Sequence, residues 1–152
     1  MRRITVLLGG IWGPDGYADS AGMWAFGRSL GAAIYTWNDW LRAAHDLGDH
    51  EVVIGYSGGG SRATWLAEET PHTIDLMVLY DPSPRWQMKR LSKRVRQTLC
   101  YYKTHPEMGP LGGGKATGDG HIDIIPISEQ HLKVDWDEKL HNMTRAAITA
   151  LL

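Results

Sequence analysis

Val52-Val53-Ile54-Gly55-Tyr56-Ser57-Gly58-Gly59, at residues 52–59, decides the fold, because an apolar strand pattern changes there into a helical pattern. The segment 51–56 is largely apolar on consecutive positions, which is typical of a strand buried on both faces of a parallel sheet. Residues 61–69 carry apolar side chains at helical spacing. Between them the sequence matches G-x-S-x-G, which predicts a sharp strand-to-helix turn with Ser57 at its tip.

The same patterns repeat on both sides of this turn. Two further apolar runs predict buried strands at residues 4–8 and 74–80, and helical patterns are found at 21–30 and 39–47. Strands and helices therefore alternate along the chain, which is typical of the α/β class. We expect a three-layer structure, in which helices cover both faces of a mostly parallel sheet.

The chain after residue 81 is harder to interpret. Residues 95–102 and 122–127 predict two more strands, and the basic stretch 89–96 indicates a solvated face. Six glycines within residues 109–120 predict a mobile loop. A C-terminal helix is expected from one apolar stripe and from a possible capping box of Asp135 and Glu138; the stripe consists of Leu140, Met143, Ala147, Ile148 and Leu151.

Length and composition limit the classes of function. The 152 residues show no repeat or linker, so we expect a single domain over residues 1–152. The 16 basic and 17 acidic residues give a net charge of −1, which argues against a nucleic-acid partner and favours a neutral small-molecule substrate. No apolar stretch approaches the roughly 20 residues of a membrane span, and a cytoplasmic location is the default expectation. The single cysteine, Cys100, predicts an inert buried thiol and no internal disulfide.

Ser57 has the surroundings that a nucleophilic serine needs. Side chains on either side of so sharp a turn would collide, which explains Gly55 and Gly59. The turn lifts the Ser57 hydroxyl above the sheet, and it points the N–H of Gly58 toward the position of a developing oxyanion. Without the strand and the helix, the same five residues would be an ordinary glycine-rich turn.

A nucleophilic serine requires a base, and the base requires an acid that orients it. Asp81 is the first candidate for the acid because it follows the predicted strand 74–80 at its carboxyl end; its alternative role is to start the turn 81–84. His131 is the first candidate for the base, since it lies in a loop before the last helix, and His121 is the second. The weaker candidates for the acid are Asp75, Asp123, Asp135 and Asp137.

Together these residues resemble the α/β-hydrolase superfamily, in particular small lid-free lipase-like hydrolases. The resemblance rests on the glycine pair 9–10 after the first strand, the G-x-S-x-G motif, an Asp-Pro after the next strand and a late histidine. It implies a reduced α/β-hydrolase fold without a cap domain, and a Ser57-His131-Asp81 triad that cleaves an ester. The chain is far shorter than a full family member, and Gly9-Gly10 replaces the usual His-Gly.

The resemblance also implies the surroundings of the triad. The oxyanion hole would consist of the Gly58 N–H and a second N–H from Gly10 or Ile11. The sequence does not show which of these two residues supplies the second N–H. Without a cap the site should be open, and Trp12 and Trp86 would line it, with Met88 beside them. The resemblance implies carboxylesterase activity that needs no metal or organic cofactor.

Three other interpretations remain. Gly58-x-Gly60-x-x-Ala63 also resembles a dinucleotide-binding fingerprint, with Asp81 about 20 residues further on. Residues 109–115 resemble a phosphate-binding loop, although Ala116 stands where Ser or Thr is needed. A hydrolase-like fold can also serve only as a binding module.

Overall fold

A computed structural model describes residues 2–9, 20–84, 88–104 and 112–151 of the chain. The described residues form one sheet of six strands in the order β2-β1-β3-β4-β5-β6. All neighbouring strands are parallel. The strands are β1 (Ile4–Leu7), β2 (Ala33–Tyr35), β3 (Glu51–Tyr56), β4 (Ile74–Tyr80), β5 (Gln97–Lys103) and β6 (His121–Ile127).

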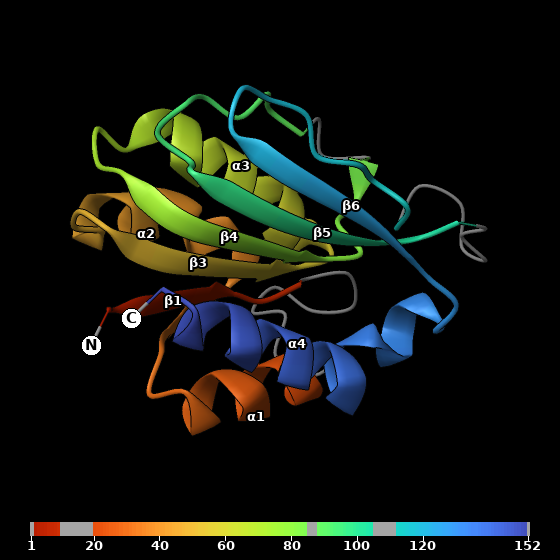
Figure 1. Cartoon of the computed structure of the whole chain (residues 1–152). Coiled ribbons are helices and arrows are strands. Elements are labelled where there is room, and N and C mark those ends of the chain that lie inside the picture. Colours follow the sequence, from red (N-terminus) through yellow and green to blue (C-terminus); the bar gives the residue numbers. More distant parts are fainter. Residues whose placement is uncertain (1, 10–19, 85–87, 105–111, 152) are drawn as a thin grey trace.

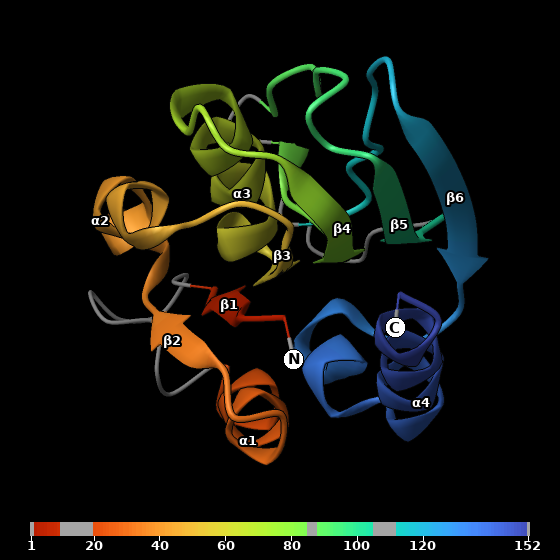
Figure 2. The same cartoon turned by 60° about the vertical axis from the view of Figure 1, so that its left-hand side comes forward.

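Helices cover both faces of this sheet. Figures 1 and 2 show α2 and α3 on one face and α1 and α4 on the other. This arrangement confirms the three-layer α/β fold. The helices are α1 (Ala21–Ser29), α2 (Trp40–Asp46), α3 (Gly58–Glu69) and α4 (Glu138–Thr149), with two 3₁₀ helices, η1 (Trp37–Asp39) and η4 (His131–Trp136).

The core has two halves, because successive side chains of a strand point to opposite faces of the sheet. Along β3, Val52, Ile54 and Tyr56 pack in the half that contains residues of α1 and α4, whereas Val53 packs in the half with residues of α2 and α3. Every residue of β3 and of β4 is buried. Each fully buried Val, Leu or Ile contributes about 1.5–3 kcal/mol relative to an exposed one. The two central strands thus form a rigid platform.

The predicted strands at 51–56 and 74–80 have the predicted bounds, and 4–8 ends one residue early. Strand β2 was not predicted, because three residues are too short for a periodic pattern. Helix α3 begins at Gly58, three residues before the expected start. Gly58 and Gly59 of the motif therefore belong to the first turn of the helix, whereas Gly55 belongs to β3.

The predicted capping box of α4 is wrong. Asp137 precedes the helix, and its side chain accepts a hydrogen bond from the Leu140 N–H. Asp135 instead lies within η4, which continues to Trp136, and its carboxylate accepts from the N–H of Gly22 at the start of α1. Because η4 occupies residues 131–136, α4 begins only at Glu138. Asp135 therefore caps the first turn of α1 and not that of α4.

Cys100 is buried, as predicted, and it is a free thiol. Burial raises its pKa to about 11, so the thiol stays protonated and unreactive near neutral pH. None of the helices that the structure describes has the length and apolarity needed to cross a lipid bilayer.

Candidate active site

Ser57 occupies a strained turn between β3 and α3. Its backbone has φ 55° and ψ −121°, a conformation that residues other than glycine rarely adopt. Neighbouring groups hold it there: the Ser57 N–H donates to the carbonyl of Tyr80 at 3.0 Å, and its carbonyl accepts from the N–H of Ser83 at 3.1 Å. Strain of this kind persists only where surrounding structure enforces it, and it is concentrated at functional sites.

The glycines of the turn allow close contact between backbones. A Cβ atom on Gly55 would lie 2.6 Å from the carbonyl oxygen of Gly59, and one on Gly59 would lie 2.3 Å from that of Leu7. Real Cβ contacts are not so short, so any side chain there would force α3 away from the strands. The predicted steric need for glycine at these two positions is confirmed.

Ser57, His131 and Asp81 meet at the carboxyl end of the sheet. The Ser57 Oγ lies 2.9 Å from His131 Nε2, and His131 Nδ1 lies 2.6 Å from Asp81 Oδ2. Tyr56 and Tyr80 are paired neighbours in the sheet, so the residues that follow them emerge side by side. His131 begins η4. The structure thus brings together the three side chains that the sequence analysis selected.

The hydrogen bonds define the tautomer of His131. Its Nδ1 lies against Asp81 Oδ2, and a carboxylate oxygen is an acceptor, so this contact fits the tautomer with the proton on Nδ1. Nε2 is therefore free to accept from the Ser57 hydroxyl. This is the arrangement in which an imidazole can remove a proton from serine.

Asp81 is held by backbone donors as well as by His131. Its Oδ1 accepts from the N–H of Lys103 and from that of Gly113, each at 2.8 Å. Its own N–H donates to the Tyr101 carbonyl at 2.7 Å, and its φ of 45° again lies in the left-handed region. The carboxylate is thereby fixed with one oxygen directed at the histidine.

The glycine-rich loop contributes to the site, which the sequence analysis did not foresee. A Cβ on Gly112 would lie 2.2 Å from Asp81 Oδ2 and 2.5 Å from His131 Nδ1, so only glycine fits there. The next glycine, Gly113, has φ 84° and donates to Asp81. The run of consecutive glycines at 112–114 was the available signal, but the pattern by itself indicates only a loop.

The three side chains are buried, while the expected openness of the site as a whole stays a prediction. The exposed fractions of Ser57, His131 and Asp81 are 1%, 3% and 0%. The backbone at Gly112 lies against the Asp81–His131 pair, and a Cβ on Gly9 would lie 3.1 Å from that of Ser57. Among the described residues, close packing of backbone at Gly9 and Gly112 contributes to this burial.

The segment that carries His131 is anchored at both ends. The Tyr56 hydroxyl donates to the His131 carbonyl at 2.7 Å, and the two rings lie 5.6 Å apart at an angle of 27°. At the other end of η4, Asp135 accepts from Gly22, and its carbonyl lies 2.7 Å from His141 Nε2. Burial lowers the pKa of His141, which favours its neutral form.

The remaining predicted site residues have different outcomes. Gly58 is the first residue of α3, where backbone N–H groups lack partners within the helix. Gly10, Ile11, Trp12 and Trp86 lie outside the described residues, so their roles stay predictions. Met88 packs beside the core half that faces α2 and α3.

The reserve base, His121, lies elsewhere. It begins β6, is exposed, and its Nε2 lies 3.2 Å from Asp123 Oδ2. The amino end of β6 is at the edge of the sheet opposite Ser57, because all six described strands run in parallel. His131 is therefore the histidine that the structure places at the serine.

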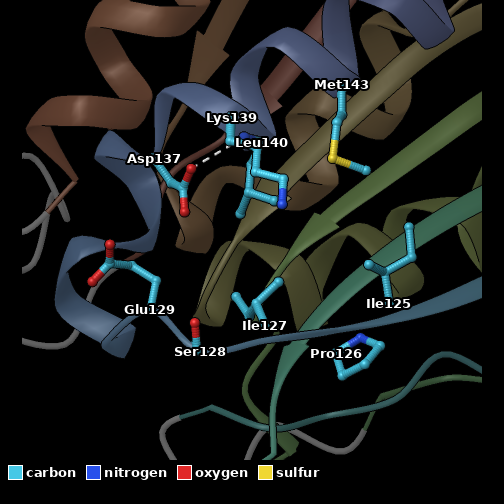
Figure 3. Close-up of a pocket in the computed structure, with 9 residues that line it drawn as sticks. All are labelled: Ile125, Pro126, Ile127, Ser128, Glu129, Asp137, Lys139, Leu140 and Met143. Atoms are coloured by element: carbon cyan, nitrogen blue, oxygen red, sulfur yellow. Dashed lines mark hydrogen bonds between the residues drawn. The ribbon is translucent and has the colours of Figure 1, made fainter.

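A cavity of about 250 Å³ lies between the end of β6 and the start of α4 (Figure 3). Asp137 is at its rim, with its hydrogen bond to Leu140, and Ile127 and Met143 contribute apolar surface. Neither Ser57 nor His131 nor Asp81 lines it. This cavity is therefore separate from the candidate active site.

The two nucleotide-binding interpretations find little support in the described residues. The Asp81 carboxylate, which would have to bind a ribose, is occupied by His131 and two backbone N–H groups. A phosphate-binding loop leads into a helix, but residues 112–120 contain none. The lysine of this motif, Lys115, lies over the ring of Tyr102, with its Nζ 4.8 Å from the ring centre.

No protein-family model matches the sequence, and a search of curated proteins found no match. Solved structures do match. Alpha/beta hydrolase domain-containing protein 10 from mouse superposes with a TM-score of 0.62 at 10% identity, over 97% of this chain and 88% of the mouse chain. A protein of the α/β hydrolase superfamily from Xanthomonas campestris gives a TM-score of 0.61 at 12% identity, over 99% of this chain and all of that chain.

The carboxylesterase CesB from Bacillus subtilis matches with a TM-score of 0.53 at 12% identity, over 96% of this chain and 82% of that chain. Identities this low establish the fold alone. The strand order, the helices on both faces and the turn at Ser57 agree with these similarities. The chain therefore has the fold of the α/β-hydrolase superfamily, in a reduced form.

Proposed function

We propose that the chain is a serine hydrolase that cleaves an ester, in the manner of a carboxylesterase. The proposal rests on one observation: the Ser57 Oγ, His131 and Asp81 form a continuous line of hydrogen bonds of 2.9 and 2.6 Å in a buried site. A serine hydroxyl becomes a nucleophile only beside such a base, and the base acts well only when a third group orients it.

In the first half of the reaction, His131 Nε2 takes the proton from Ser57 Oγ while Oγ forms a bond to the ester carbonyl carbon. The carbonyl electron pair moves to oxygen, and the N–H of Gly58 with a second N–H from Gly10 or Ile11 receives this oxyanion. Asp81 stabilises the imidazolium by its charge and keeps the proton on Nδ1.

Collapse of the intermediate breaks the bond to the alcohol, which leaves with the proton that His131 Nε2 donates. The product is an acyl group on Ser57. Water then attacks this acyl carbon while His131 takes its proton, and the same steps in reverse release the carboxylic acid and restore the Ser57 hydroxyl.

The choice of an ester rests on two considerations. The net charge of −1 provides no strong field for a polyanionic substrate, which favours a small neutral one. One of the structurally similar proteins is a carboxylesterase. Thioesters and amides undergo the same steps, so a set of esters, thioesters and amides of increasing acyl length distinguishes the substrate classes.

The decisive experiment uses a fluorophosphonate probe, which forms a covalent bond with an activated serine. We expect the wild type to be labelled on the peptide that contains Ser57, as identified by mass spectrometry, and Ser57→Ala to be unlabelled. Ser57→Ala should also lose ester turnover by several orders of magnitude while unfolding like the wild type.

Ser61→Ala is the matched control. Ser61 is also buried in α3, but its hydroxyl donates to the Ser83 carbonyl and not to a histidine. This variant should be labelled like the wild type. A wild type that stays unlabelled, or a Ser57→Ala variant that still hydrolyses esters, contradicts the proposal.

A further inference from the structure

We propose that Tyr56 is a positioning residue, which sets the place of His131 relative to Ser57; this inference rests on the function proposed above. Tyr56 directly precedes Ser57 in the chain, and its hydroxyl donates to the His131 carbonyl at 2.7 Å. One residue is therefore bonded covalently to the nucleophile and by a hydrogen bond to the base. Nothing in the G-x-S-x-G motif requires a tyrosine at this position.

Tyr56 is suited to this role because its own position is rigid. It is the last residue of β3, which pairs with β1 on one side and with β4 on the other. Its side chain is 1% exposed and packs in the core half that contains Met23 and Leu140. The Tyr56 side chain therefore links the His131 backbone to the rigid strand β3.

His131 needs such an anchor because of the segment that carries it. It begins η4, a 3₁₀ helix, whose hydrogen-bond geometry is poorer than that of an α-helix. The preceding residue, Gln130, makes no side-chain capping hydrogen bond. The contacts of Asp135 with Gly22 and His141 hold the far end of η4. At His131 itself, Asp81 holds the imidazole and the Tyr56 hydroxyl holds the backbone carbonyl.

The Ser57–His131 distance of 2.9 Å leaves little tolerance for movement. A displacement of about 1 Å would exceed the normal range of a hydrogen bond, and misplacement of this size can lower rates by about 100-fold. Loss of the Tyr56 hydroxyl should therefore lower the reactivity of Ser57, although this hydroxyl is bonded to the backbone of His131 and not to its imidazole.

Tyr80 provides a matched control. It is the last residue of β4, is 0% exposed, and its hydroxyl also donates to a carbonyl of the C-terminal region, that of Leu140 at 3.1 Å. Tyr80→Phe and Tyr56→Phe each remove one buried hydroxyl from the end of a central strand. A purely structural role of Tyr56 predicts the same behaviour for both variants.

The test compares the rate of fluorophosphonate labelling and the Tm of the two variants. We expect both variants to lose Tm, but Tyr56→Phe to be labelled about 10- to 100-fold more slowly than the wild type and Tyr80→Phe at the wild-type rate. With an ester that the wild type hydrolyses, Tyr56→Phe should lower kcat and leave KM unchanged. Equal labelling rates for the two variants overturn the inference.

A second measurement separates this inference from the proposed function. The Nδ1 proton of His131, shared with Asp81, should give a downfield proton resonance, assigned by its absence in His131→Gln. We expect Tyr56→Phe to broaden or shift it and Tyr80→Phe to leave it in place. If the wild type is not labelled, a selective change in Tyr56→Phe still supports positioning by Tyr56, whereas an unchanged resonance overturns it.

Discussion

Strand β4 has an aspartate near each end, Asp75 within it and Asp81 directly after it, and each aspartate is bonded to a histidine. At the amino end, Asp75 Oδ1 lies 3.0 Å from His50 Nδ1; at the carboxyl end, Asp81 Oδ2 lies 2.6 Å from His131 Nδ1. The same pair of side chains thus occurs at opposite edges of one sheet. Only the pair at the carboxyl end has a serine hydroxyl at the second imidazole nitrogen.

The two pairs differ in their charge environment. Asp75 also faces Arg2 at 2.7 Å and Arg96 at 3.9 Å, so guanidinium groups compensate its charge. Among the described residues, the Asp81 carboxylate is bonded to His131 and to backbone N–H groups. An aspartate whose charge is directed at one imidazole can stabilise an imidazolium there, whereas an aspartate shared among cations stabilises the fold.

The two pairs also differ in exposure, for a reason that lies in the fold. The side chain of His50 is 52% exposed, and that of His131 is 3% exposed. In an open parallel sheet, ligands and catalytic groups gather at the carboxyl ends of the strands. At the carboxyl edge, loop backbone therefore covers the Asp81–His131 pair. At the amino edge, His50 of the other pair stays in contact with solvent.

The largest expected difference is in activity. Asp81→Asn should lower kcat for an ester by about 10⁴-fold. The two backbone N–H groups at Oδ1 hold the amide oxygen there, so the amide NH2 donates to His131 Nδ1 and leaves the imidazole proton on Nε2. Asp75→Asn should leave kcat unchanged. Steady-state kinetics on both variants checks this, and an equal loss for both would show that the two pairs do not differ in function.

A smaller effect is expected from the backbone that encloses the Asp81–His131 pair at the carboxyl end of the sheet. Gly112→Ala should destabilise the fold by about 1–3 kcal/mol in urea unfolding, since the new methyl group would overlap Asp81 and His131. It should also slow fluorophosphonate labelling. Gly48→Ala is the control, because its methyl group would meet only Glu51 at 3.7 Å. Equal stability of the two variants would contradict the close packing at Gly112.

The Asp75–His50 pair, at the amino end of β4, should make the stability of the fold depend on pH. Burial raises the pKa of Asp75, but hydrogen bonds and charge from His50 and Arg2 lower it more strongly, to below its ordinary value of 3.8. The ionised group therefore stabilises the folded state above pH 3.8, and this stabilisation is lost as the pH falls below that value. The Tm of Asp75→Asn should lie below that of the wild type at neutral pH, and the gap should narrow in acid. A constant gap would argue against an ionic role.

The smallest effect is expected at the exposed histidine. His50→Gln should change the free energy of unfolding by less than about 1 kcal/mol, because the His50 side chain is half-exposed and its charge is screened by solvent. Urea unfolding measures this change. A loss of unfolding free energy as large as that of Gly112→Ala would mean that the Asp75–His50 pair contributes as much to stability as the packing around Asp81 and His131.

Local patterns in the sequence were enough to predict the α/β layers and the turn at Ser57. Consecutive apolar residues mark β3 and β4, and the steric demands of a sharp turn explain Gly55 and Gly59. The position of Asp81 at a strand end followed from the same pattern. These features depend on neighbours within a few residues, which the sequence displays directly.

The positions of Asp81 and His131 in the chain and the family resemblance selected them as partners of Ser57, but only the tertiary structure shows that the three side chains meet. His131 is 74 residues from Ser57 and 50 from Asp81, and the Tyr56 hydroxyl reaches across 75 residues. The close approach of Gly112 to Asp81 and His131 likewise has no local signature. Contacts over such separations depend on how strands are ordered and helices are packed, so the sequence by itself determined most of the elements, the nucleophile's turn and the candidate partners of Ser57, and tertiary packing determined how these side chains meet.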